Sequence, residues 1–209
     1  MSRSVLPVVA ILVLLVPSAC TRPPAQLYVL NPITAPEGSA RPAAGVRTLA
    51  ILPVTVPDYL DRREIVSRTT DHRLRLSDSD RWGESLQDGL ARVLTIDLGR
   101  LLAPDGFVVT SGGHQPKVDA ELSLTVDAFE IDPDGNALLA ARWILLDDRR
   151  SESARHFQAV YSEPVASGSG STRAAAEVAA LNRDVDRLAA DIAKSARQSL
   201  PRPRRSRKR

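Results

Sequence analysis

The sequence predicts a single α+β domain with an antiparallel or mixed sheet and two main helices packed on one side of it. Three observations lead to this prediction. Several segments alternate apolar and polar residues with a period of two, as strands with one wet face do. Two longer segments repeat apolar residues every three or four positions, as amphipathic helices do. Along the chain the order is strands, helix, strands, helix, which is typical of the α+β class.

The first strands are predicted in the N-terminal third of the chain. The short run QLYVL, residues 26–30, fits a strand, and residues 48–56 are apolar and β-branched. Pro53 inside the second run indicates an edge strand or a bulge, because proline cannot donate to the ladder. After the polar stretch 57–63, two short strands are expected around a turn at Thr70 and Asp71: residues 65–69 and 72–76.

Two helices are predicted from their apolar stripes. The first runs from Asp80, which can cap its start, to Ala103, with Pro104 and Gly106 ending it. The second covers residues 171–199, and its spacing suits packing on the sheet or a seam between helices. The stripes consist of Trp82, Leu86, Leu90, Val93, Leu94, Leu98 and Leu101 in the first, and Val178, Leu181, Val185, Leu188 and Ile192 in the second.

Between the helices the pattern predicts a strand at 106–110 and then a three-stranded meander. Phe129 and Ile131 fall out of phase with the alternation before them, which indicates a bulge near Ala128. The turn Asp132-Pro133-Asp134-Gly135-Asn136 joins the first two strands. The meander strands are 118–131, 137–147 and 154–162.

The N-terminus reads as an export signal. Arg3 precedes the uncharged run 5–16, and the small residues Ser18 and Ala19 follow it. Twelve apolar residues are too few to span a bilayer, which needs about 20. We therefore expect residues 1–19 to be a signal peptide, with 20–46 forming a lipidated N-terminus and flexible tether rich in Pro, Ala and Gly.

Cys20 is the only cysteine of the chain. It has no partner for an intramolecular disulfide, no neighbouring metal ligands and no local base to activate it. Attachment of a lipid remains, with an exported protein carrying a free thiol as the alternative. Residues 18–20 resemble a bacterial lipobox, although Pro17 stands where leucine is expected. By the same resemblance, Thr21 after the cysteine favours the outer membrane.

The C-terminal residues 201–209 carry six basic side chains. The net charge of +3 falls to +2 without Arg3 and to −4 without these six, so the basic character belongs to the tail. We expect a disordered tail, with attraction to phosphate-rich head groups as its functional alternative. The domain between, residues 47–200, lacks a basic face for nucleic acid.

The sequence predicts no catalytic or metal site, and no cofactor beyond the covalent lipid on Cys20. His72, His114 and His156 fall in different elements without a second ligand at a suitable spacing. The run 168–170 lacks the lysine of a phosphate loop. The turn 132–136 departs from a calcium loop in its glycine position and its missing glutamate. We therefore do not expect an enzyme.

Residues 54–86 resemble the signature region of the auxiliary lipoproteins of ABC-type, MCE-linked lipid transporters, a family of paraquat-inducible intermembrane transport lipoproteins. The match includes the run Val56 to Arg62 (VPDYLDR), then Ile65 and Val66, and Trp82, Glu84 and Leu86. Gly83 and Ser85 replace the usual alanine and proline. Residues 28–30 and the strand around Trp143 also fit, so the resemblance covers most of residues 20–200.

The resemblance implies an outer-membrane lipoprotein that faces the periplasm. It implies an accessory or docking role for an MCE-domain protein of an ABC transporter that moves lipids between the two membranes. A homo-oligomer is a further possibility. A stand-alone periplasmic protein that binds lipids or small ligands is the alternative function.

Loop residues 57–63 are our first candidates for partner contact. The loop is polar, and its aromatic and arginine side chains are types favoured at interfaces. The alternative is a structural turn whose tyrosine packs on the sheet. The candidate residues are Pro57, Asp58, Tyr59, Leu60 and Arg63, together with Trp82.

Overall fold

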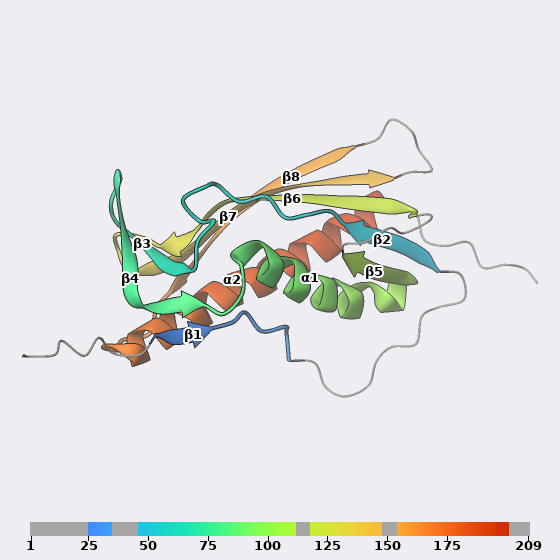
Figure 1. Cartoon of the computed structure of the whole chain (residues 1–209). Helices are drawn as coiled ribbons and strands as arrows, with labels where there is room; N and C mark the ends of the chain where they lie inside the picture. The colour runs from blue at the N-terminus through green and yellow to red at the C-terminus, as the bar shows by residue number, and fades with distance from the viewer. Residues whose placement is uncertain (1–24, 35–45, 112–117, 148–153, 201–209) are drawn as a thin grey trace, which may run out of the picture.

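The computed structural model describes residues 25–34, 46–111, 118–147 and 154–200. They form one mixed eight-stranded sheet with two α-helices on one of its faces (Figure 1). The predicted α+β class is therefore confirmed. No helix in these ranges is both long enough and apolar enough to cross a bilayer.

Strand β6 (Ala120–Ile131) organises the sheet. Along one edge it pairs antiparallel with β7 (Asn136–Asp147), which in turn pairs with β8 (Arg155–Pro164). This is the predicted meander. The register between β6 and β7 shifts between Val126 and Ala128, which confirms the predicted bulge.

The other edge of β6 is shared by two branches of the sheet. The first branch pairs in parallel with the start of β6, from Leu49–Ala120 to Ile51–Leu122. The second meets its end at the pair Ser67–Ile131. The first branch consists of β2 (Arg47–Ile51) and β5 (Phe107–Ser111), and the second of β3 (Glu64–Thr70), β4 (Arg73–Trp82) and β1 (Gln26–Tyr28).

Three predicted boundaries were wrong, and the third is the strand expected at 72–76, which extends to Trp82 as β4. Strand β2 ends at Ile51 instead of residue 56 and lies inside the sheet, although pairing with β6 resumes at Thr55 after Pro53 interrupts it. The first helix begins at Leu86 instead of Asp80. Asp80 and Trp82 instead belong to β4, because pairing with β1 and β3 keeps this stretch extended.

Helices α1 (Leu86–Leu102) and α2 (Ser171–Ser199) pack on the same side of the sheet, and α2 contacts α1, β7 and β8. A short 3-10 turn, η1 (Ala103–Asp105), and Gly106, whose φ is 83°, lead from α1 into β5. Side chains fill the space between sheet and helices. Those without exposed area include Leu90, Leu94, Leu98, Leu122, Leu124, Val126, Leu139, Val185, Leu188 and Ile192.

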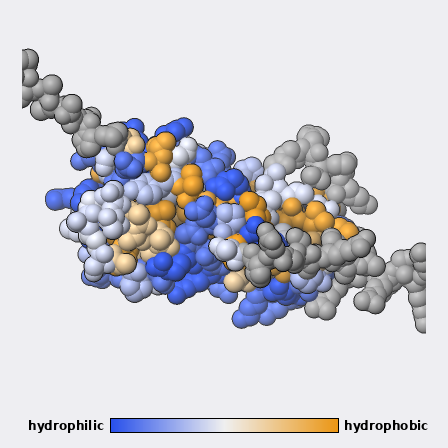
Figure 2. All heavy atoms as spheres, turned by 90° about the horizontal axis from the view of Figure 1, so that it is seen from below, coloured by the Kyte–Doolittle hydropathy of each residue, from blue (hydrophilic) through white to orange (hydrophobic). Residues whose placement is uncertain are grey.

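The described ends of the chain lie at opposite ends of α2. The hydroxyl of Tyr28 in β1 donates to the main-chain oxygen of Ser171, the first residue of α2, over 3.3 Å. Leu200 directly follows the other end of this 29-residue helix, which is about 43 Å long at 1.5 Å per residue. Figure 2, which views the molecule from below, shows a mostly hydrophilic surface crossed by a band of apolar side chains.

Candidate functional site: the N-terminal strap

Residues 25–34, which we call the strap, cross both helices before the chain reaches β2. The strap is the first described segment after the predicted lipidation site. Its strand β1 pairs in parallel with the end of β4, from Gln26–Asp80 to Tyr28–Trp82. The amide of Gly83 donates to the carbonyl of Tyr28 over 2.8 Å. Thus the strap begins as an added edge strand of the second branch.

Tyr28 joins the strap to β4 through its side chain as well. Its one hydroxyl proton is shared between the main-chain oxygen of Ser171 and the carboxylate of Asp80, each 3.3 Å away. Partial burial, followed by the negative charge of Asp80, raises the pKa of the Tyr28 hydroxyl. The phenol therefore stays protonated and able to donate at neutral pH.

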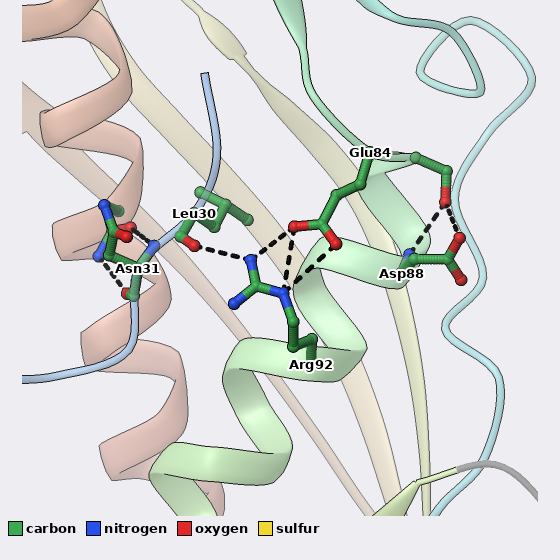
Figure 3. Close-up of polar contacts among 7 residues, drawn as sticks. Leu30, Asn31, Glu84, Asp88 and Arg92 are labelled. Carbon is green, nitrogen blue, oxygen red and sulfur yellow. Dashed lines mark hydrogen bonds and ion pairs between the residues drawn. The ribbon is translucent and has the colours of Figure 1, made fainter. Parts of the chain in front are cut away.

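Beyond β1 the main chain of Leu30 is held by an arginine of α1. The carbonyl of Leu30 accepts from Nη2 of Arg92 over 2.9 Å (Figure 3). Glu84 fixes the same guanidinium, with 2.5 Å between Oε1 and Nη2 and 3.2 Å between Oε1 and Nε. The hydrogen bond to Glu84 raises the pKa of Arg92. The Leu30 side chain is itself buried, with 2% exposed.

The next residue of the strap is bound by α2. The side-chain oxygen of Asn182 accepts from the amide of Asn31 over 2.7 Å, and its nitrogen donates to the Asn31 carbonyl over 3.0 Å. Figure 3 places this contact beside the Arg92 contact, so neighbouring residues of the strap are bound by different helices.

Ile33 is held by two more side chains of α1. Its amide donates to Oδ1 of Asp97 over 2.9 Å, and its carbonyl accepts from Nη1 of Arg100 over 2.5 Å. Asp97 has no exposed area, and burial raises its pKa to about 6. The Ile33 amide and Arg100 lower this pKa and the charge of Asp186 raises it further.

The start of α1 explains why Glu84 is available to the strap. Ser85 caps the helix, because its hydroxyl oxygen accepts from the amide of Asp88 over 3.1 Å and donates to the Asp88 carboxylate over 2.6 Å. Glu84 stands just before the cap. Its side chain is therefore free of the cap and turns toward Arg92 (Figure 3).

The signature residues at and just after the end of β4 thus have structural roles. Trp82 is 5% exposed and packs against Phe129, with ring centroids 5.9 Å apart. Leu86 is 4% exposed and belongs to the core. Glu84 between them holds the arginine that binds the strap. Together these residues connect β4, the core and the strap.

The predicted partner loop 57–63 lies on the bulge of β6. The hydroxyl of Tyr59 donates to the carbonyl of Asp127 over 3.3 Å. The Asp127 carboxylate in turn binds Arg142 through two hydrogen bonds of 2.7 and 2.8 Å. Burial, together with the charge of Glu130, raises the pKa of Tyr59 to about 12. Tyr59 therefore fastens the loop to the sheet.

Other members of the predicted contact set divide into buried and exposed groups. Leu60 is 2% exposed, and with Trp82 it lies in the core. Asp58 and Arg63 are exposed, and Pro57 is half-buried. The carbonyl of Arg63 accepts from the amide of Trp82 over 2.6 Å, so the structure joins the end of the loop to Trp82. Cys20 lies outside the described residues.

The sequence did not reveal the side chains that bind the strap. Arg92, Arg100 and Asn182 look like ordinary polar residues of helix surfaces. Asp97 did carry a signal, because it falls among the apolar positions of α1 between Leu94 and Leu101. A carboxylate at such a position needs a polar partner, which here is the strap. Within the described ranges, no three or more His, Cys, Asp or Glu side chains are grouped to hold a metal ion.

Comparisons with known proteins agree on one family. The family model described as the ABC-type transport auxiliary lipoprotein component matches residues 28–193. The intermembrane transport lipoprotein PqiC of Escherichia coli (strain K12) is 30% identical over 120 residues, as is PqiC of Shigella flexneri. The match covers 56% of this chain and 62% of each relative's length.

Two solved structures share the fold. A crystal structure of an uncharacterized protein has a TM-score of 0.66 at 21% identity, covering 82% of this chain and 98% of the other. Protein XCC0632 from Xanthomonas campestris has a TM-score of 0.61 at 16% identity, covering 82% and 94%. The strap from residue 28, the loop 57–63 and both helices as far as residue 193 fall inside the matched range.

Proposed function

The chain belongs to the ABC-type transport auxiliary lipoprotein component family, and on this premise we propose that it is an outer-membrane-anchored periplasmic lipoprotein. In this role it carries lipid on Cys20 and docks an MCE-domain protein of an ABC transporter that moves lipids between the membranes. The name of PqiC, an intermembrane transport lipoprotein, supports this role. The family is one of transport auxiliaries, and the proposed role needs no catalysis by this chain.

The strap is the observation that carries the proposal. An anchor on Cys20 would hold the domain through residues 21–34, and the strap is bound by β4, α1 and α2. Each net hydrogen bond contributes about 0.5–1.5 kcal/mol, so the contacts together keep the strap on the domain. Glu84, a signature residue, takes part in these contacts. Glu84 thus links the family signature to the strap, through which the proposed anchor would hold the domain.

Metabolic palmitate labelling tests the anchor. We expect label and membrane association in the wild-type chain, and loss of both in Cys20→Ala. Because Cys20 is the only cysteine, no other thiol can accept the lipid. Equal labelling of the two proteins would contradict the anchor.

Pull-down of the MCE-domain protein of the same organism tests docking. Asp58 and Arg63 are exposed and lie beside Tyr59, which the sheet holds in place. We expect Asp58→Ala with Arg63→Ala to weaken capture at least tenfold while the fold is kept. The control is Asp134→Ala with Arg155→Ala, two exposed positions away from the loop. Undiminished capture by the folded loop variant would remove this loop from the proposal.

The packing favours docking over the stand-alone ligand-binding alternative. A lipid carrier needs an apolar cavity, whereas the layer between sheet and helices is filled by fully buried side chains. The hollow of about 490 Å³ on the uncovered face of the sheet is open and of mixed character, because polar side chains such as Ser123 and Gln158 line it together with Ile144 and Phe157. Lipid co-purifying with the protein at a ratio near one, detected by mass spectrometry, would favour the alternative.

A further inference from the structure

One end of the molecule carries exposed apolar and basic side chains beside the point where the chain leaves toward Cys20. We call it the anchor end and define it by Leu27, Val29, Arg73, Arg75 and Leu76. Figure 1 shows the hairpin of β3 and β4, the start of β1 and the start of α2 at this same end.

Three apolar side chains of the anchor end are exposed. Leu27 is 65% exposed and Val29 is 46% exposed, although both lie in the strap, whose main chain is bound. Leu76 of β4 is 38% exposed. Figure 2 shows apolar side chains on this side of the molecule, both near this end and toward the opposite end. Folding has left these side chains outside the core, so they are available to a partner.

The arginines of the anchor end are available as well. Arg73 and Arg75 are exposed, and neither forms an ion pair with a carboxylate of the described residues. Asp71 and Asp78 are exposed on the same hairpin, so the charges of the surface balance. A surface with balanced charge and apolar side chains suits a layer of zwitterionic head groups, where phosphates meet arginines and ammonium groups meet carboxylates.

Chain length places a bilayer at this surface. Six residue steps separate Cys20 from Gln26, and at 3.3–3.6 Å per residue they span at most about 22 Å. The far end of α2 lies about 43 Å along the helix.

We propose that the anchor end rests on the zwitterionic head-group layer of the bilayer that holds Cys20, with α2 directed away from it. Leu27 and Val29 enter the interface, and Arg73 and Arg75 contact phosphates. This orientation rests on the proposed acylation of Cys20. It turns the far end of α2 away from the bilayer.

Site-specific quenching on vesicles tests the orientation. Acylation consumes the Cys20 thiol, so one added cysteine is the only free thiol in the mature lipoprotein. A fluorophore is placed at Thr70→Cys on the hairpin or at Lys194→Cys, which is exposed on α2 about 35 Å from its start. The mature protein is reconstituted in vesicles of phosphatidylcholine and phosphatidylethanolamine that contain a head-group quencher.

We expect quenching at residue 70 to exceed that at residue 194 at least threefold. Equal quenching at both positions would mean that the molecule lies flat on the bilayer. Stronger quenching at residue 194 would mean that the far end of α2 faces the bilayer. Either result overturns the proposal. Protein that fails to float with the vesicles overturns the proposed anchor together with the orientation. Protein that floats without preferential quenching at 70 overturns the orientation alone.

Two further variants distinguish contact from mere tethering. In the Thr70→Cys protein, Leu27→Ser with Val29→Ser is expected to reduce quenching at least twofold, and so is Arg73→Gln with Arg75→Gln. The matched control is Val160→Ser, which changes a side chain 70% exposed on β8 and should leave quenching unchanged. Full quenching in both anchor-end variants would show a domain that hangs from its tether without touching the bilayer.

Discussion

Asn182 binds the main chain of Asn31 in both directions, accepting from its amide over 2.7 Å and donating to its carbonyl over 3.0 Å. The pattern is that of one step in a β-ladder, provided here by a side chain of a helix. Because Asn31 lies in the strap, this single side chain joins the proposed anchor region to the longest element of the fold.

Asn182→Ala removes both bonds and should release the middle of the strap. Two net hydrogen bonds are worth about 1–3 kcal/mol together, so the amide of Asn31 should exchange with deuterium about tenfold faster or more. Hydrogen-exchange mass spectrometry of the strap measures this. Arg183→Ala, next to it on α2 and paired with Glu163 on β8, is the control and should leave strap exchange unchanged.

Arg92→Ala should lower the free energy of unfolding more than Glu84→Ala does. Arg92 donates to the Leu30 carbonyl and to Glu84, whereas Glu84 contacts only the arginine among the hydrogen bonds of this cluster. Both side chains are about a third exposed or more, so the ion pair alone contributes less than about 1 kcal/mol. Urea unfolding of both single variants and of the double variant gives the coupling free energy between Glu84 and Arg92. A Glu84→Ala loss that equals the Arg92→Ala loss would contradict the role of Leu30.

Asp97 should make stability depend on pH between about 4 and 6. Its pKa is about 6 in the folded protein against 3.8 for an ordinary aspartate, so the folded state holds the proton more tightly. The raised pKa therefore stabilises the folded state fully below about pH 4, where the carboxyl is protonated in both states. This contribution to the free energy of unfolding is lost as pH rises toward 6. Asp97→Asn keeps an oxygen for the Ile33 amide and carries no charge.

Urea unfolding of wild type and Asp97→Asn at several pH values isolates this group from Asp184, whose pKa burial also raises to about 6. We expect the free energy of unfolding of the variant, relative to that of wild type, to rise by about 2 kcal/mol between pH 4 and pH 7. A constant difference between the two proteins across this range would contradict a raised pKa at Asp97.

Gly83 should tolerate alanine but not valine. A Cβ at this position would lie 3.1 Å from Cγ1 of Val29 and 3.5 Å from the carbonyl oxygen of Tyr28. Val29 is 46% exposed and can move aside for one methyl group. Valine adds two more carbons toward β1, so Gly83→Val should speed exchange of the strap amides several-fold while Gly83→Ala leaves them near wild type. Equal exchange in both variants would show that β1 does not pack closely on residue 83.

The sequence predicted the meander well because local pattern and tertiary structure agree there. The alternation from Ala120 to Val126 puts apolar side chains against the helices, and the phase change at Phe129 marks the observed bulge. Residues 77–82 misled the prediction. Serine and aspartate in this stretch look like a helix start, but pairing with β1 and β3, which is long-range, keeps it extended.

The candidate site was less accessible to prediction for a related reason. The strap is bound through its main chain by side chains 62 to 151 residues away in sequence, and no local periodicity reports such contacts. The loop around Tyr59 was foreseen as a feature, and the two readings of its tyrosine were a partner contact and a structural turn. The bond to Asp127 gives Tyr59 a structural role and leaves Asp58 and Arg63 exposed.

Main-chain recognition of the strap has a consequence for divergence between relatives. The hydrogen bonds that Asn182, Asp97 and Arg100 form with the strap go only to amides and carbonyls of residues 31 and 33, which every amino acid except proline supplies in full. Mutations that change the side chains there leave the contacts in place. The two positions can therefore drift in sequence between relatives while these contacts persist, whereas Tyr28 and Leu30, whose side chains also contact the domain, are more constrained.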